Sequence, residues 1–464
     1  MSKLLFKPLL LSVLCAAALT GCQIKPESTA DIAGSIAKQE GAVSTKQNQL
    51  IDYKRFFKDE HLQQYISAAL QHNHDVAIAQ LNLAKVQAIY QLEQADTWPQ
   101  VMASAGQTRT GLAQSQGGGI NQQAEVAVGI TAFELDFFGK QQNLTEQALQ
   151  QFYASEQAVQ VTQLLVITEV ANAYTQVQAS QQQWQIAKET VENQQASLTI
   201  ISEKARLGAV SELDLAQTSA QLASAKTEQI RLARQLALAQ NALQILLGNK
   251  QVNAANLPSI APELSSIDTQ AFADGLPASL LAQRPDLRQA EHQLQAAEAN
   301  IAHARTAFFP SISLTSKIGS ASNELNGLFD SGSGAWVFSP SIQLPIFDGG
   351  RNNANLAQSQ VARDIVLADY QHSIRQAFRE VRDALVERSS YQQQLQSQTE
   401  LLEHLATSYR LAQARYQAGA DSYLQVLDAQ RSWYNGKQQH IQLQQANLTA
   451  QISLFKALGG GMQP

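Results

Sequence analysis

Few side chains in this 464-residue sequence have the types and spacing that catalysis or metal binding requires. His72 and His74 are possible metal ligands by type, but residues two apart on a helix point in different directions. We interpret them as surface histidines and predict no metal site. The sequence also contains no recognisable nucleophile–base set and no phosphate-binding loop, so an enzyme is the least favoured class.

The clearest chemical signal is Cys22, at the end of the stretch Leu19-Thr20-Gly21-Cys22. Lys3 and Lys7 precede a short apolar run, residues 8–19, as in an export signal. The stretch resembles a bacterial lipobox, which implies cleavage before the cysteine and a covalent lipid (palmitate among its acyl chains) on the Cys22 sulfur and amine. The alternative is an ordinary signal peptide followed by a stray cysteine.

This interpretation makes residues 1–21 a signal peptide and residues 22–57 a lipidated tether, which is polar and shows no regular period. Gln23 follows the cysteine, where an Asp would indicate retention in the inner membrane, so Gln23 favours the outer membrane. Acyl chains on one residue anchor a protein firmly. Cys15 leaves with the signal, so we expect no thiol chemistry and no cofactor besides the lipid.

Charge argues against nucleic acid as a partner. The sequence has 33 Lys and Arg against 39 Asp and Glu, a formal net charge of −6, which becomes −8 when Lys3 and Lys7 are removed (−6 − 2). An acidic chain without a basic run is a poor nucleic-acid binder. No segment after the signal is apolar for long enough to be a membrane helix.

The sequence is a tandem duplication with one constant spacing. Gly208 matches Gly419 (419 − 208 = 211) and Ser211 matches Ser422, and in each copy a glycine that can end a helix precedes a serine that can cap the next. One spacing held without a gap indicates two equivalent halves of one architecture. Further pairs with the same spacing are Leu70 and Leu281, Asp75 and Asp286, Pro99 and Pro310, Lys140 and Arg351, Glu169 and Glu380, and Leu247 and Leu458.

Each half contains a predicted β-hairpin, at residues 99–138 and 309–347, with apolar and polar residues alternating. The alternation changes parity near Ala132, which predicts a bulge or an exit from a membrane. Pro340 conflicts with a strand interior because proline donates no ladder hydrogen bond. The apolar set of the second hairpin is Ile312, Leu314, Ile318, Trp336, Phe338, Ile342, Leu344 and Ile346.

Strands of about ten residues with one apolar face are typical of outer-membrane barrels, although a soluble hairpin with one buried face is the alternative. Four strands are too few to close a barrel, and an open sheet edge cannot lie in lipid. If these strands span a membrane, several chains must share one barrel, and three chains supply twelve strands.

Two long helical stretches of equal length, 140–206 and 351–417, contain neither proline nor glycine. At about 1.5 Å per residue, each is about 100 Å long. Return helices of roughly half that length follow at residues 211–247 and 422–457. The first of them carries a coiled-coil heptad that includes Leu222, Leu232 and Leu243.

The rest of each long helix needs another partner, which we expect to be the helix before each hairpin, at residues 58–97 and 277–308. A turn at residues 73–75 interrupts the first of these. The repeats are therefore assigned to residues 58–248 and 277–459, with a linker at 249–276 and a tail at 460–464.

Several motifs together resemble one known family over nearly all of the mature chain. They are Phe133-Glu-Leu-Asp-Phe-Phe-Gly139, Gln283-Arg-Pro-Asp286, Phe308-Phe-Pro-Ser-Ile312, Pro345-Ile-Phe-Asp-Gly-Gly-Arg351, Ala377-Phe-Arg-Glu-Val381, residues 414–431 and Ala457-Leu-Gly-Gly-Gly461. The chain resembles the outer membrane factor (TolC-like) family, in its lipoprotein branch that serves resistance–nodulation–division efflux pumps. It departs at Phe133 and Met462, where other residues are usual, and its first turn lacks a counterpart of Tyr416.

The resemblance implies a mainly α fold with a membrane β-barrel part. Three tandem-duplicated protomers would form a twelve-stranded barrel in the outer membrane and a twelve-helix α-barrel tunnel through the periplasm of a Gram-negative bacterium. Such a protein is a gated conduit for drug export in a tripartite pump and not an enzyme. Within the family, metal-ion efflux and type I secretion are further options.

The resemblance also implies a gate at the turns, where the second-repeat helices bend inward. It implies a bond between Tyr416 and Asp214, a constriction at Leu424 and Asp428, and Arg431 beside Asp428. We predict that Asp428→Ala weakens cation selectivity and that Tyr416→Phe raises leak. Alternatively, Asp428 and Arg431 form an ordinary surface pair, and Asp214 is a first-turn residue favoured by the helix dipole.

The partners implied are two further copies, a periplasmic adaptor that docks on the turns, an inner-membrane transporter that supplies the energy, and outer membrane lipid. The docking residues expected are Gly208, Ser211, Gly419 and Ser422. Two other classes remain open. A periplasmic adaptor should show one hairpin between halves of a β-domain, and a pore-less coiled-coil lipoprotein would need no lipid-facing strands.

Overall fold

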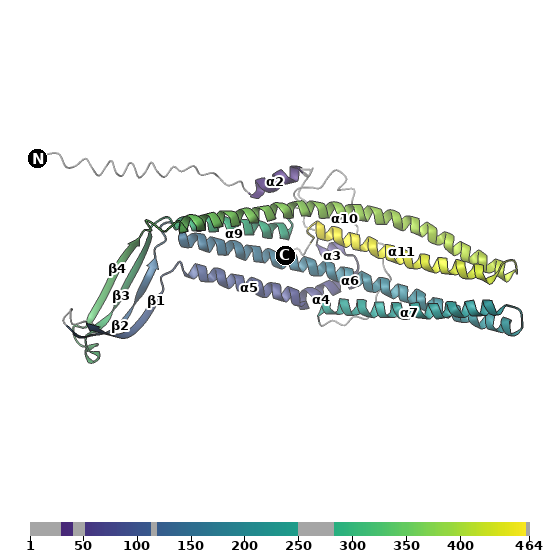
Figure 1. Ribbon diagram of the computed structural model, residues 1–464, viewed down its shortest axis with the longest axis horizontal. Helices are drawn as coiled ribbons and strands as arrows, with labels where there is room; N and C mark the ends of the chain where they lie inside the picture. Colours follow the sequence, from purple (N-terminus) through teal and green to yellow (C-terminus); the bar gives the residue numbers. More distant parts are fainter. Residues whose placement is uncertain (1–28, 40–51, 113–117, 249–282, 461–464) are drawn as a thin grey trace.

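The structure is a computed structural model, and it describes residues 29–39, 52–112, 118–248 and 283–460. The signal peptide, Cys22, the linker at 249–276 and residues 461–464 lie outside the described residues, so the predictions made for them stay predictions. A β-sheet lies at one end of an elongated molecule, and long helices run from it to two turns at the other end (Figure 1).

The sheet has four antiparallel strands in the order β1-β2-β3-β4. Strands β1 (Val101–Leu112) and β2 (Gly119–Glu134) form the first predicted hairpin, and β3 (Ser311–Ser322) and β4 (Gly334–Gln343) form the second. The hairpins join through β2 and β3, where Val128 pairs with Ile318. One sheet is therefore built from both repeats, and its two edges, β1 and β4, are unpaired in the described chain.

The pairing places the predicted apolar residues on one face of the sheet. Ala103 lies opposite Val128, Val128 opposite Ile318, and Ile318 opposite Trp336, and residues that lie opposite each other share a face. Ile318 and Trp336 are 72% and 76% exposed. The alternation predicted from the sequence is confirmed, and no described element of the chain covers the apolar face of these two residues.

The predicted bulge is present in β2. Ile130 pairs with Ser316 but Phe133 pairs with Leu314, so three steps on β2 match two on β3. Ala132 absorbs the extra residue with a φ of 51°, and its N–H donates to the Thr315 hydroxyl at 3.0 Å. The parity change in the sequence therefore marks a β-bulge.

Pro340 is accommodated because β4 is an edge strand. It lies opposite Leu314. The Ile312 carbonyl accepts from the N–H of Leu135, so Ile312 and, two residues on, Leu314 direct their backbone groups toward β2. The pair with Pro340 is consequently a non-hydrogen-bonded one, and the proline nitrogen faces the open edge.

The prediction was wrong about the end of this strand. We expected the alternation to continue through Leu344 and Ile346, but β4 ends at Gln343. Pro345 lies between those two apolar residues, and its missing N–H stops further pairing. Ile346 is 94% exposed beyond the strand.

The helices follow the predicted ranges closely. The long helices are α6 (Lys140–Arg206) and α10 (Arg351–Gln417). The return helices are α7 (Glu212–Leu247) and α11 (Tyr423–Ala457), and they begin one residue late because Ser211 and Ser422 occupy the N-cap positions. The shorter helices are α4 (Glu60–His72), α5 (His74–Ala95) and α9 (Pro285–Thr306), and Asn73 separates the first two as predicted.

Each long helix packs on its return helix near the turn and on shorter helices near the sheet. Helix α9 lies between α6 and α10 (Figure 1), so it contacts the long helices of both repeats rather than only that of its own. One apolar core gathers around α4, α6 and α7 with Ile66, Tyr174 and Leu243, and a second gathers around α9, α10 and the end of α11 with Leu294 and Phe378.

The tether prediction was wrong for two segments. Helix α2 (Thr29–Gln39) packs on α10, with Ile32, Ile36 and Ala37 buried in the second core. Helix α3 (Tyr53–Phe56) is capped by Asp52. Phe56 and the adjacent Phe57 pack on Phe455 of α11, with ring centroids 4.6 Å and 5.3 Å apart. Helix α3 has four residues, too few for a helical period to be detected in the sequence. Helix α2 is longer, and the spacing of Ile32 and Ile36, four apart, was the signal that could have revealed it.

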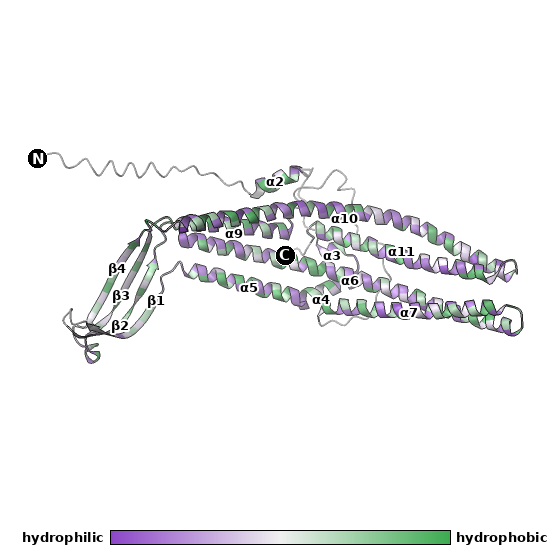
Figure 2. Cartoon of the chain, in the orientation of Figure 1, coloured by the Kyte–Doolittle hydropathy of each residue, from purple (hydrophilic) through white to green (hydrophobic). Residues whose placement is uncertain are grey.

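Hydrophobic and hydrophilic residues are mixed along every long helix, as Figure 2 shows. The predicted heptad is largely confirmed, because Thr218, Leu222, Leu232, Ala239 and Leu243 are buried against neighbouring helices. A second row on α7 faces outward, with Ile230, Leu238 and Ile245 each at least 60% exposed. None of the helices in the described ranges combines the length and apolarity needed to cross a membrane.

Candidate gate at the helical turns

The two turns at the far end of the molecule share one backbone design. Gly208 and Gly419 have φ values of 72° and 76°, a left-handed conformation that glycine adopts readily. After them, the N–H of Ala209 donates to the Lys204 carbonyl at 2.8 Å, and the N–H of Ala420 donates to the Arg415 carbonyl at 2.9 Å. These helix-ending bonds are equivalent, because their donors are related by the offset of the repeat (420 − 209 = 211).

The side chains of the first turn form a capping box at the start of α7. The Asp214 N–H donates to the Ser211 hydroxyl at 3.1 Å, and the Ser211 N–H donates to the Asp214 carboxylate at 3.1 Å. This arrangement satisfies two otherwise unpaired donors of the helix N-terminus.

The second turn is fixed differently. Ser422 makes no side-chain cap hydrogen bond. Instead the Arg415 guanidinium donates twice to the Asp421 carboxylate, at 2.6 Å and 3.0 Å, across the turn. These hydrogen bonds and the positive charge lower the pKa of Asp421. The second turn therefore depends on a solvent-facing ion pair, and the first on local capping.

Tyr416, which we expected to bond Asp214, contacts Lys204 instead. The Lys204 ammonium lies 3.4 Å from the Tyr416 hydroxyl and 5.0 Å from its ring centroid. Within one chain, the predicted Tyr416–Asp214 hydrogen bond is not formed in the described residues. The reason is that Asp214 is held by the cap of its own helix, while Lys204 faces the Tyr416 ring from α6.

The other predicted gate residues lie on α11. Arg431 donates to the Asp428 carboxylate at 2.8 Å, and their side chains are 62% and 50% exposed. Leu424 is 45% exposed. In one chain these residues have the geometry of a surface ion pair beside an uncovered leucine, and a ring requires further copies.

Sequence reasoning missed a set of polar links between the two repeats. The Gln194 amide of α6 donates to the Gln430 amide oxygen of α11 at 2.8 Å, and the two residues are only 6% and 9% exposed. Farther from the turns, Gln445 donates to Gln176 at 2.6 Å. The one available signal was that Gln430 continues a buried row on α11 that otherwise consists of apolar residues such as Val426 and Leu427.

A cavity of about 280 Å³ lies beside this buried glutamine pair, between α6, α7 and α11. Its lining is mainly polar and includes Gln194, Gln430 and the predicted gate residue Arg431. The Gln194 amide oxygen is buried without a hydrogen-bond partner among the described residues. Near the turns the hairpins therefore meet through an incompletely satisfied polar pair beside a cavity, whereas farther from the turns Ile441, Leu448 and Ile452 of α11 pack in the apolar core of the first repeat.

Near the turns this polar pair restrains the two hairpins only weakly. A neutral hydrogen bond contributes only about 0.5–1.5 kcal/mol, less than the roughly 1.5–3 kcal/mol of one fully buried apolar side chain. Among the described residues, no group of three or more His, Cys, Asp or Glu could hold a metal ion. The interactions available at the site are thus hydrogen bonds and ion pairs between side chains of the two hairpins and their turns.

Comparison with known proteins gives a consistent picture. The sequence profile of the family described as Outer membrane efflux protein matches residues 65–249 and 276–460, and both ends of the two matches differ by 211 (276 − 65 and 460 − 249). The chain is 40% identical over 415 residues to the solvent efflux pump outer membrane protein SrpC of Pseudomonas putida, covering 88% of this chain and 87% of that protein.

It is also 38% identical over 461 residues to the cation efflux system protein CusC of Escherichia coli O6:H1, covering 98% of this chain and 99% of that one. Among solved structures, a membrane protein from Pseudomonas aeruginosa superposes with a TM-score of 0.84 at 33% identity, over 90% of this chain and 97% of that one. The similarity thus extends over both repeats and over the whole architecture.

Proposed function

Since the chain belongs to the outer membrane efflux protein family, we propose that it is the channel through which a tripartite pump exports small molecules. It is an outer membrane protein that extends into the periplasm, and the members of its family are channel proteins. One observation carries the proposal. A sheet with an uncovered apolar face is joined, at one end, to helices of 67 residues that continue for about 100 Å.

Three copies close the barrel. A single chain leaves the edges β1 and β4 unpaired, which lipid does not tolerate. Pairing β4 of one copy with β1 of the next removes every edge, with one ladder hydrogen bond missing at Pro340, whose nitrogen faces that edge. Three copies give the twelve strands that we predict. The outward row Ile230, Leu238 and Ile245 on α7 then has a neighbouring copy to pack against.

The channel is gated at the turns by the second hairpin. Threefold symmetry converts Asp428, Arg431 and Leu424 into rings, and the links from Lys204 to Tyr416 and from Gln194 to Gln430 hold the second hairpin against the first. An adaptor that binds around Gly208, Ser211, Gly419 and Ser422 separates the hairpins. The energy comes from the inner-membrane transporter of the pump, and Cys22 carries the lipid.

The cargo we propose is organic and small. Relatives of similar identity are named as solvent, toluene and antibiotic efflux proteins of Pseudomonas putida. One relative is named as part of a cation efflux system, which makes metal ions the second candidate. Expressing the chain with its pump in a host without its own channel, and comparing growth in the presence of toluene with growth in the presence of transition-metal salts, separates the two.

Single-channel recording tests the channel and the gate together. Asp428→Asn leaves three arginines without partners in the trimer, whereas Arg431→Gln leaves three aspartates. We therefore expect the reversal potential in a KCl gradient to move toward anion selectivity in the first variant and toward cation selectivity in the second. A wild-type trimer that never conducts sinks the channel proposal, and identical reversal potentials in both variants sink the gate assignment.

A further inference from the structure

Each repeat contains a joint, about half way along the molecule, where the return helix ends against the shorter helix. In the first, the Asn73 amide donates to the Leu246 carbonyl of α7 at 3.1 Å. In the second, the Arg284 guanidinium donates to the Ala457 carbonyl of α11 at 2.9 Å. Donors and acceptors are both 211 apart (284 − 73 and 457 − 246), so the two joints are equivalent.

Both joints are closely packed and buried. Asn73 and Arg284 are each 5% exposed. Gly248 and Gly459 follow the capped carbonyls with φ values of 65° and 74°. A Cβ at Gly248 would lie 2.7 Å from the backbone oxygen of His72, and one at Gly459 would lie 2.9 Å from Cγ of Arg284. The last carbonyls of a helix lack partners within it, and here a neighbouring helix supplies the donor.

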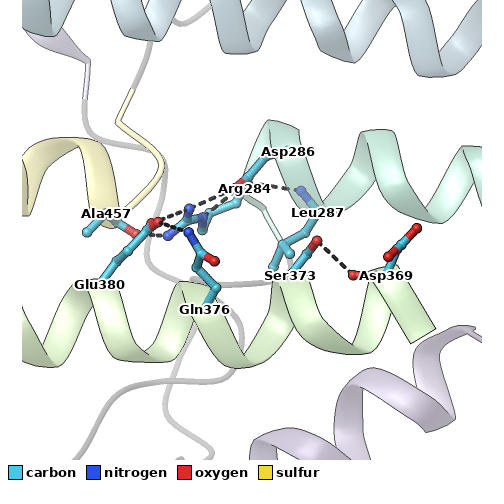
Figure 3. Close-up of polar contacts among 8 residues, drawn as sticks. All are labelled: Arg284, Asp286, Leu287, Asp369, Ser373, Gln376, Glu380 and Ala457. Carbon is cyan, nitrogen blue, oxygen red and sulfur yellow. Dashed lines mark hydrogen bonds and ion pairs between the residues drawn. The ribbon is translucent and has the colours of Figure 1, made fainter. Parts of the chain in front are cut away.

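The joints differ in charge and in the number of helices they connect. The Asn73 side chain is neutral and otherwise caps its own α5, accepting from Asp75 and Val76. Arg284 also donates to Asp286, beside it, and at 2.7 Å to Glu380 of α10 (Figure 3). The residue equivalent to Glu380 in the first repeat, Glu169, is exposed.

Arg284 therefore connects α9, α10 and α11, and it does so in apolar surroundings. Leu287, Leu454 and Leu458 belong to the second core, which also contains Phe378 and Ile36 of α2. Burial favours the neutral form of Arg284, but its hydrogen bonds to Asp286 and Glu380 outweigh that effect and raise its pKa. The arginine stays charged. Its own side chain is buried whereas the carboxylates of Asp286 and Glu380 are partly exposed, so losing a partner leaves a buried charge incompletely paired.

We propose that Arg284 is a positioning residue for the gate: it clamps the inner ends of α9 and α11 to the middle of α10, so that the second hairpin moves only by bending toward its turn. The inference rests on the proposed channel function. Helix α11 has 35 residues, so the turn lies about 50 Å from the clamp. A rotation of about 5° at the joint would displace the turn by about 4 Å over that length.

The first repeat shows why a charge is used in the second. The first hairpin has a neutral joint and a locally capped turn, and in the proposed gate it stays in place. The second hairpin has a turn held by a solvent-facing ion pair, and it contacts the first through polar links beside a cavity. A hairpin that is loosely held at its turn end needs a firm hold at the other end.

The test compares Glu380→Gln, which removes the negative charge that α10 offers to Arg284, with Glu169→Gln, the equivalent change in the first repeat. Arg284→Asn gives the second joint the neutral donor of the first. In purified trimers carrying spin labels at residues 209 and 420, we expect Glu380→Gln and Arg284→Asn to widen the distance distribution between the turns at least 1.5-fold. Their mean single-channel conductance should rise at least twofold, while Glu169→Gln matches the wild type.

Unchanged label distances in both Glu380→Gln and Arg284→Asn overturn the clamp, even if the wild type conducts. If Arg284→Asn does not assemble, Glu380→Gln decides alone, since it leaves Arg284 with Asp286 and the Ala457 carbonyl. A merely structural role lowers the unfolding temperature of the variants without moving the labels, and this outcome also counts against the clamp. Absence of wild-type conductance is a failure of the channel proposal and leaves the label measurement valid.

Discussion

At the scale of single residues, the two turns differ through a few positions that are equivalent in the two repeats. Arg415 corresponds to Lys204, Tyr416 to Ala205 and Asp421 to Val210. The first turn thus cannot form the ion pair that crosses the second one. Two copies of one backbone design have acquired different kinds of stabilisation, local capping in the first and an exposed pair in the second.

The exposed pair makes the second turn sensitive to acid. The pKa of Asp421 is lowered in the folded protein by the hydrogen bonds from Arg415. Its contribution is therefore present above the ordinary aspartate pKa of about 3.9 and is lost as the pH falls through the lowered value. We expect a spin label at residue 420 to stay immobile in the wild type at about pH 4 and to become mobile only when the pH falls below the lowered pKa of Asp421, whereas in Asp421→Asn it is mobile at neutral pH.

Ser422→Ala is the matched control, because Ser422 makes no side-chain cap bond, and its label should behave as in the wild type. A label that is equally immobile in Asp421→Asn at pH 7 would show that the ion pair does not hold the turn.

Tyr174 provides a residue-scale test of stability away from the gate. Its side chain is fully buried, and its hydroxyl donates to the Asp59 carboxylate at 2.6 Å. Burial, followed by that hydrogen bond and the charge of Asp59, raises the pKa of Tyr174. We expect Tyr174→Phe to lower the free energy of unfolding by about 1.5–3 kcal/mol, measured by chemical denaturation of the trimer in detergent.

Tyr65→Phe is a useful comparison, since the Tyr65 ring packs against Tyr174 at a centroid distance of 5.9 Å in the same core. Both substitutions keep the aromatic ring, so an unchanged free energy of unfolding in Tyr174→Phe would mean that the bond to Asp59 does not contribute to stability.

The sequence predicted residue contacts only where they are local. The Asp428–Arg431 pair follows from a spacing of three on one helix. The contact of Lys204 with Tyr416 joins positions far apart in the chain (416 − 204 = 212), and it depends on how the two hairpins are rotated against each other. No pattern in one sequence encodes that rotation, and the predicted partner Asp214 was wrong within one chain for this reason.

At the scale of elements, the long helices were predictable to the residue because their limits are set by local chemistry. Gly139 and Gly350 precede them with φ values of 77° and 88°, and neither proline nor glycine interrupts them. Helices α2 and α3 were missed because their stability comes from tertiary packing on α10 and α11 rather than from length.

The backbones of β2 and β3 lie very close together at Gly319, which allows a prediction about the assembly of the sheet. A Cβ at Gly319 would overlap the Val126 carbonyl oxygen and lie 2.5 Å from Cα of Ala127. A methyl group there must push the strands apart, so we expect Gly319→Ala to reduce the yield of assembled trimer in the outer membrane at least several-fold. The yield is measured by heat-modifiable migration on gels.

Gly106→Ala on β1 is the matched control, because its added Cβ would meet nothing within 4 Å. If the two variants assemble equally well, backbone proximity between β2 and β3 does not limit assembly.

At the scale of the whole molecule, the chain is incomplete as a membrane protein until its sheet edges are paired. We expect a cysteine at residue 104 on β1, combined with cysteines tried in turn at 337, 339 and 341 on β4, to form intermolecular disulfides. Oxidation should give a ladder of one, two and three linked chains that stops at three. A ladder that continues past three, or linked dimers alone, would contradict the shared barrel.

The repeat was predictable at this scale, and the packing of its halves was not. The constant offset between the repeats fixes which elements are equivalent, and hydrophobic alternation fixes the apolar face of the sheet. The position of α9 between α6 and α10 depends on side-chain fit between helices with similar, weakly apolar surfaces. The composition of a helix and the period of its apolar residues do not show which of several similar helices it packs against.

The pairing of β2 with β3 also sets an order of events during biogenesis. Val128 and Ile318 are neighbours in the sheet but lie far apart in the chain (318 − 128 = 190), so the first hairpin waits for the rest of the first repeat and for the start of the second, as far as β3, to be exported. Contacts of such high sequence separation form late. The waiting hairpin has small apolar residues, Ala103, Ala105 and Val126, whereas Trp336 and Phe338 arrive last. These two large side chains of the sheet therefore emerge only when its other three strands are already present, which shortens the time during which they are available for aggregation in the periplasm.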